Sequence, residues 1–188
     1  MDKKLHLGIK SQPDDTTCGP TCLHAVYTYF GDKISLDKVI GQVKQLKGGG
    51  TLAVLLGCHA LRRGYRAKLY TFNLQVFDPT WFAPGAPAIE ERLTTQMKVK
   101  KNSKIRTASK AYLDFLRLGG RICFEDLTSS LIRGLLKRSI PILTGLSATF
   151  LYRTARETAL GKKLVYDDIQ GEPTGHFVVL CGYNMQDR

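Results

Sequence analysis

The sequence contains no run of about 18 apolar residues. Because a membrane-spanning helix needs about 20 mostly apolar residues, we expect no transmembrane helix. The first eight residues, Met-Asp-Lys-Lys-Leu-His-Leu-Gly, also lack the apolar stretch of a secretory signal. The five cysteines are an odd number and do not follow the spacing of a disulfide framework. These absences predict a reduced, cytoplasmic protein.

Acidic side chains are few, with 16 Asp and Glu against 28 Lys and Arg, so the formal net charge is +12. This excess favours anionic partners in general, without choosing among nucleic acid, membrane surfaces and acidic peptides. The densest basic segment contains Lys98, Lys100, Lys101, Lys104, Arg106 and Lys110. It has none of the aromatic residues that nucleic-acid platforms place between their cations. We therefore predict no nucleic-acid binding, and a solvated helical face or a basic rim for an acidic peptide.

The sequence also lacks the recurring cysteine pairs of structural zinc sites. Cys18 and Cys22 make one pair of suitable spacing, with His24 close by, but no second pair follows. The glycine-rich residues 47–50 have no predicted strand before them and no Lys-Ser/Thr after them, so they indicate a helix end rather than a phosphate loop. We predict no metal site and no cofactor.

The 188 residues show no internal repeat, low-complexity tract or linker, and we predict one domain over residues 1–188. Apolar periodicity predicts helices early in the chain and strands later. Helices are expected over about 18–30, 35–46, 51–63, 88–118 in two parts, and 128–138. Strands are expected at 5–10, 65–72, 121–124, 140–147 and 175–183. This order is typical of an α+β fold with N-terminal helices packed on a mostly antiparallel sheet.

Cys18 lies at the start of the first predicted helix, after Thr16 or Thr17 as a possible N-cap and just before Pro20. Gly31 supplies the expected end of this helix. Unpaired backbone N–H groups and the helix dipole stabilise a thiolate at a helix N-terminus, and a thiolate is the nucleophile that attacks an acyl carbon. Cys18 is therefore a candidate nucleophile.

Two other residues suit the same chemistry. Gln12, six residues before Cys18, can direct a side-chain amide at a developing oxyanion, and the backbone N–H of Cys18 would be the second donor. His176 stands at the head of the apolar strand 175–183 and is a candidate general base.

The pattern Gln12-x5-Cys18-Gly19 with a following helix, and the late strand Gly175-His176-Phe-Val-Val, resemble the papain-like fold. Within that fold the chain is similar to the double-glycine leader peptidases that trim bacteriocin precursors, as a free-standing member. This resemblance implies a thiol protease or amidohydrolase that cleaves a peptide or protein, such as a leader or tail, through a thioester on Cys18. It also implies that His176 is the base and that Gln12 completes the oxyanion hole.

Members of that family orient the histidine with an Asp or Asn on the next strand. The candidates here are Asn184 and Asp187, and the chain ends at Arg188. We predict that the last strand or strands are missing and that a longer reading frame supplies the orienting residue. The alternative is a catalytically impaired peptide-binding module of the same fold. Hydrolysis and acyl transfer both remain open as fates of the thioester.

Overall fold

The computed structural model describes residues 2–46, 49–160 and 163–184. The chain divides into two compact units. Unit 1 consists of Met1–Ile40 and Arg133–Arg188, and unit 2 consists of Gly41–Ile132. Unit 1 therefore combines the two ends of the chain, and it contains Gln12, Cys18 and His176. This division into two compact units does not test the prediction of one domain over residues 1–188, which stays a prediction.

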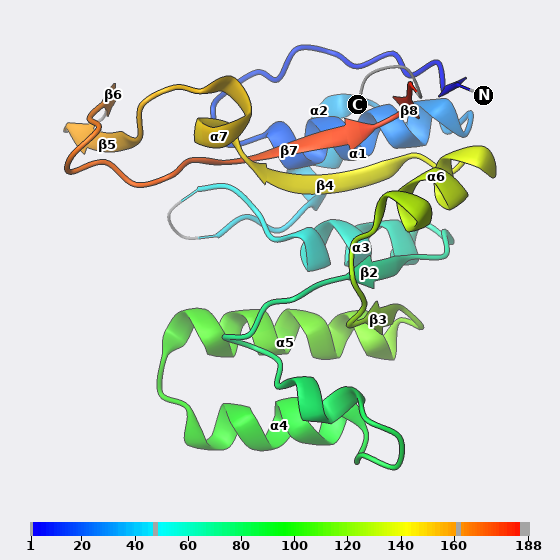
Figure 1. Ribbon diagram of the computed structural model, residues 1–188, viewed down its shortest axis with the longest axis vertical. Helices are drawn as coiled ribbons and strands as arrows, with labels where there is room; N and C mark the ends of the chain where they lie inside the picture. Colours follow the sequence, from blue (N-terminus) through cyan, green and yellow to red (C-terminus); the bar gives the residue numbers. More distant parts are fainter. Residues whose placement is uncertain (1, 47–48, 161–162, 185–188) are drawn as a thin grey trace. The chain divides into compact units, whose positions relative to one another are not determined.

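Helix α1 (Cys18–Tyr29) packs against strand β7 (Gly175–Leu180) in unit 1 (Figure 1). The predicted helix start is confirmed at Cys18, and Gly31 has a φ of 80°, the left-handed conformation that glycine adopts without strain after a helix. Thr17 precedes the helix, but its side chain makes no cap; its hydroxyl donates to the Asp14 carbonyl instead.

Strand β4 (Ile142–Ser147) pairs with β7 in antiparallel register, with Leu146 opposite His176. The chain between these strands forms helix α7 (Ala148–Tyr152) and the antiparallel pair β5 (Glu157–Leu160) and β6 (Lys163–Tyr166). Strand β1 (Lys3–Lys4), near the start of the chain, pairs in antiparallel register with β8 (Gly182–Tyr183).

Two predicted elements are wrong in position or length. The strand expected at residues 5–10 is replaced by β1, which ends at Lys4. The pairing of this segment with β8 ends where Leu5 donates its backbone N–H to the Cys181 carbonyl, and Ile9 beyond that bond is exposed. The second predicted helix, α2 (Leu36–Gln42), ends four residues before Leu46. Glycine within a helix costs about 1 kcal/mol relative to alanine, and Gly41 lies in its last turn.

Unit 2 contains α3 (Ala53–Arg62), the 3-10 helix η1 (Pro79–Phe82), α4 (Ile89–Val99) and α5 (Ser103–Arg117). The predicted division of residues 88–118 into two helices is confirmed, because the Asn102 side chain accepts the N–H groups of Lys104 and Ile105 and so caps α5. Helix α6 (Ser129–Lys137) spans the boundary between the units. The N-cap of α3 is Leu52, whose side chain makes no capping hydrogen bond.

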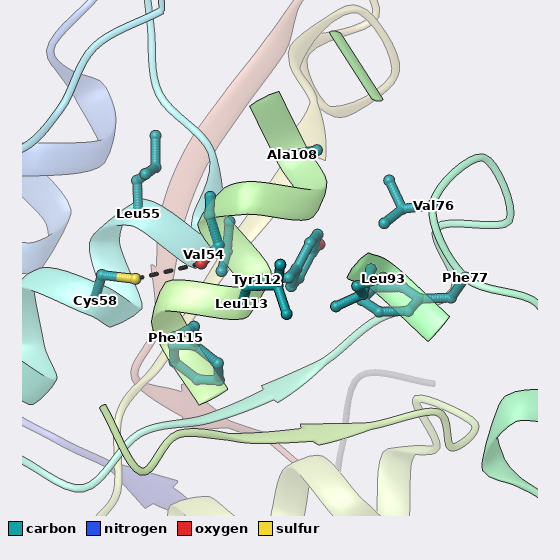
Figure 2. Close-up of a cluster of buried hydrophobic side chains, with 11 residues drawn as sticks. Val54, Leu55, Cys58, Val76, Phe77, Leu93, Ala108, Tyr112, Leu113 and Phe115 are labelled. Atoms are coloured by element: carbon teal, nitrogen blue, oxygen red, sulfur yellow. Dashed lines mark hydrogen bonds between the residues drawn. The ribbon is translucent and has the colours of Figure 1, made fainter. Parts of the chain in front are cut away.

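The core of unit 2 packs α3, α4 and α5 together (Figure 2). Cys58 donates its thiol to the Ala111 carbonyl at 3.6 Å, and the ring of Phe77 meets that of Tyr112 edge-on at 4.6 Å between centroids. The buried side chains of this core are Val54, Leu55, Cys58, Val76, Phe77, Leu93, Ala108, Ala111, Tyr112, Leu113 and Phe115.

The chain has a mixed α+β fold, as predicted. The single mostly antiparallel sheet is wrong, since the strands of the described residues form four separate pairs. Three pairs are antiparallel, and β2 (Lys68–Tyr70) runs parallel to β3 (Arg121–Cys123). Helices α4 and α5 lie between β2 and β3 in the chain, which is the long crossover that a parallel pair requires. Among the described helices, none has the length and apolar character needed to cross a bilayer.

Gly57 in α3 is expected to resist substitution. A Cβ added there would lie 2.7 Å from Cε2 of the fully buried Phe115. We expect Gly57→Ala to lower the free energy of unfolding, because overpacking costs about 1–3 kcal/mol while the gain in helix propensity is about 1 kcal/mol. Urea denaturation measures the difference.

Gly134 in α6 is the matched control, because a Cβ there has no neighbour within 4 Å. Gly134→Ala should therefore stabilise the protein by about 0.5–1 kcal/mol. Equal stabilisation by both substitutions would contradict the close packing of α3 on Phe115.

Candidate active site

A hydrogen-bonded turn leads into Cys18. The Asp14 carboxylate accepts the Thr16 backbone N–H at 2.7 Å and the Thr16 hydroxyl at 2.8 Å. These bonds from Thr16 lower the pKa of Asp14, because they favour the ionised carboxylate. The Thr17 hydroxyl adds a bond to the Asp14 carbonyl at 3.2 Å. The turn therefore fixes the chain immediately before the helix.

Cys18 is the first residue of α1 and is half-buried, whereas Gly19 and Pro20 behind it are buried. The first turn of a helix leaves backbone N–H groups without intrahelical partners, and Pro20 in this turn has no backbone N–H group. The Cys18 thiol thus lies at the positive end of the helix dipole and stays partly accessible to solvent. Both properties suit a nucleophile.

The thiol of Cys22 ties α1 to β7. It donates to the Phe177 carbonyl at 3.2 Å, a bond between residues 155 positions apart. Cys22 lies one helical turn after Cys18, and Phe177 directly follows His176. Figure 1 shows α1 and β7 running in the same direction, so Cys18 and His176 stand at the same end of the helix and strand pair.

Cys22 and Cys18 differ in their surroundings. Cys22 is 3% exposed, and burial, with a smaller contribution from the charge of a Cys18 thiolate, raises the pKa of Cys22 to about 11. The sequence did not predict the hydrogen bond from Cys22 to β7. The signal was its spacing of four from Cys18, which places both thiols on one helix face.

Gln12 lies in unit 1, in irregular chain before the Asp14 turn, and is half-buried. The direction of its side-chain amide toward an oxyanion stays a prediction. The structure brings the segments of Gln12, Cys18 and His176 into one compact unit.

The two candidate orienting residues are placed differently. Asn184 is exposed and follows β8, so it lies beyond the end of β7 opposite to His176. Extended chain rises about 3.3 Å per residue, and Asn184 is eight positions after His176, so the structure does not bring Asn184 to His176. Asp187 lies outside the described residues.

The basic segment of residues 98–110 belongs to unit 2 and spans the end of α4 and the first half of α5. Its six cationic side chains are exposed. Residues 41–132 contain 15 Lys and Arg against 6 Asp and Glu, a net charge of +9 out of +12. Most of the charge excess therefore belongs to the unit that does not contain Cys18.

Among the described residues, no group of three or more His, Cys, Asp and Glu side chains is placed to hold a metal ion. Comparison with protein-family models, curated proteins and solved structures found no match to this chain. The chemistry of Cys18, His176 and Gln12 is accordingly the basis on which a function can be argued.

Proposed function

We propose that the chain is a cysteine peptidase or amidase with a papain-like fold, in which Cys18 is the nucleophile and His176 the general base. The observation that carries the proposal is the bond from the Cys22 thiol to the Phe177 carbonyl. It fixes the helix that begins with Cys18 against the strand that begins beside His176. A half-buried thiol at a helix N-terminus and an imidazole at the same end are the two groups that acyl transfer to sulfur needs.

The proposed reaction has two stages. The Cys18 sulfur attacks the carbonyl carbon of a peptide or amide, His176 takes the thiol proton, and the leaving amine receives that proton as the carbon–nitrogen bond breaks. Water then attacks the resulting thioester and releases the acid, with His176 accepting a proton from the water and returning one to the thiol. In both stages the Gln12 side-chain amide and the Cys18 backbone N–H donate to the oxyanion.

The pH dependence of alkylation by iodoacetamide tests this pair without a known substrate. We expect Cys18 to react rapidly at pH 6 and Cys22 to stay unmodified until the pH approaches its pKa of about 11. His176→Ala should slow the reaction of Cys18 at pH 6 by about tenfold or more. Loss of the ion pair lowers the thiolate fraction by roughly 10², and a thiol of higher pKa recovers only part of that through greater nucleophilicity. Fragment-ion mass spectrometry locates the modified cysteine.

Cys181 is the internal control for that experiment. It is a free, half-buried cysteine of the same unit, directly after β7. A Cys18 that reacts no faster than Cys181 at pH 6, or whose rate is unchanged in His176→Ala, would refute the proposed dyad.

The exposed position of Asn184 favours a second candidate, a peptide-binding module of the same fold that lacks an oriented base. In that case Cys18 would alkylate no faster than Cys181 at pH 6, while peptide binding would be retained. The two candidates therefore give opposite results at pH 6.

A further inference from the structure

Unit 1 carries an open hollow of about 490 Å³. Its volume falls within the range of about 300–1,000 Å³ that is typical of ligand sites. The residues that line it are Ser147, Thr149, Phe150, Arg153, Arg156 and Pro173. Arginine supplies all of the formal charge in this lining.

The hollow is built on the residues that immediately precede His176. Ser147 pairs with Gly175 in the β4–β7 register, and the Thr174 N–H donates to the Thr149 hydroxyl at 3.1 Å. The backbone N–H of Ala148 donates to the Thr174 carbonyl at 2.7 Å. A peptide whose reacting carbonyl lay at His176 would therefore have neighbouring residues within reach of this hollow.

The structure describes the backbone of one arginine and the side-chain bonds of the other. Arg153 ends α7 with a φ of 51°, a left-handed conformation that is strained for a residue with a Cβ. The Arg156 guanidinium donates to the carbonyls of Asp168 and Ile169, which fixes it at the base of the β5–β6 pair. Guanidinium groups so placed match the two oxygens of a carboxylate.

Asp167, whose carboxylate interacts with the charge of Arg156, is engaged by backbone groups. The Asp167 carboxylate accepts the backbone N–H groups of Ile169 and Gln170 at 2.9 and 2.8 Å, and these bonds lower the pKa of Asp167. Its oxygens therefore stabilise the turn.

Phe150 supplies the apolar part of the hollow. This side chain is 86% exposed, so its ring is an apolar surface in contact with water. An apolar side chain laid on its ring would remove that surface from water at about 25 cal/mol per Å². The hollow thus combines one apolar surface with two cations, of which Arg156 is held by hydrogen bonds.

We infer that this hollow binds a carboxylate of the peptide substrate together with an adjacent apolar side chain. The inference rests on the proposed function, since it names the substrate class of the same site. The carboxylate can come from an acidic side chain within the peptide or from its C-terminus, and it lies between Arg153 and Arg156 while the apolar side chain covers Phe150.

The test is binding of three N-acetylated peptides to the Cys18→Ala protein, measured by isothermal titration calorimetry at low salt. The first is Gly-Ala-Leu-Glu-Ala-Gly amide, with a side-chain carboxylate. The second is Gly-Ala-Gly-Ala-Ala-Leu with a free C-terminus, and the third is Gly-Ala-Leu-Gln-Ala-Gly amide, without a carboxylate. We expect at least one carboxylate peptide to bind about tenfold or more tightly than the glutamine peptide, and the better of the two identifies the source.

Arg153→Gln should abolish that preference, whereas Arg138→Gln should preserve it. Arg138 is an exposed arginine of the same unit, directly after α6, and its side chain donates to the Gly134 carbonyl of that helix, so it controls for loss of one positive charge. Phe150→Ser should weaken binding of the carboxylate peptides without removing the preference. Equal binding of all three peptides, or equal loss in the two arginine variants, would overturn the inference. The Cys18→Ala protein cannot form a thioester. Peptide binding to it therefore tests this inference separately from the alkylation experiment, which tests the peptidase proposal.

Discussion

Cys18→Ala should reduce hydrolysis of 4-nitrophenyl acetate to the rate without protein, a loss of at least about 10³-fold. This activated ester needs no specific binding site. It acylates the Cys18 sulfur and releases 4-nitrophenolate, and water then frees acetate from the thioester. Because alanine offers no nucleophile at the helix N-terminus, both stages stop. The absorbance of 4-nitrophenolate at about 400 nm follows the reaction.

Cys181→Ala is the matched control, because it removes the other free, half-buried cysteine of unit 1. It should leave the rate of hydrolysis unchanged. Activity retained in Cys18→Ala would end the hypothesis that Cys18 is the nucleophile. Activity lost equally in both variants would point to a general effect on the fold, which thermal unfolding of the two proteins detects.

The parts of the fold that local chemistry determines were predictable from the sequence. Pro20 and Gly31 mark the first helix, and Asn102 marks the start of α5, because each acts on backbone groups within one turn. α2 was predicted too long because its apolar pattern continues to Val43, which is buried although it lies outside the helix.

The pairing of strands could not be predicted in the same way. β2 lies beside β3 although α4 and α5 separate them in the chain, and no local signal specifies that partner. The same limit applies to the candidate site. Residue types and spacing singled out Cys18 and His176, but the bond between Cys22 and Phe177 depends on packing across 155 positions.

The hollow beside His176 shows this limit most clearly. Residues 149–174 are rich in charged and turn-forming residues and indicated only a long connection before the His176 strand. Their common role arises because β4 and β7 pair at Ser147 and Gly175, which brings both ends of the connection together. A pattern within one segment cannot report a surface that two segments share.

Gln12→Ala should lower kcat for hydrolysis by about 10²–10³, the usual effect of losing one oxyanion donor. The same substitution should leave the rate of iodoacetamide alkylation at Cys18 nearly unchanged. Alkylation displaces iodide from an sp³ carbon and develops no oxyanion, so it depends on the thiolate alone. The contrast between the two rates separates a donor to the oxyanion from a residue that merely supports the loop.

Gln170→Ala is the control for that contrast, because Gln170 is an exposed glutamine of unit 1 whose backbone N–H makes its hydrogen bond to Asp167. It should change neither rate. If Gln12→Ala slowed alkylation as strongly as hydrolysis, Gln12 would be acting on the helix start that holds Cys18, through the irregular chain between them. If it slowed neither, the oxyanion would be held by the Cys18 backbone N–H with some other donor, and the implied role of Gln12 would be wrong.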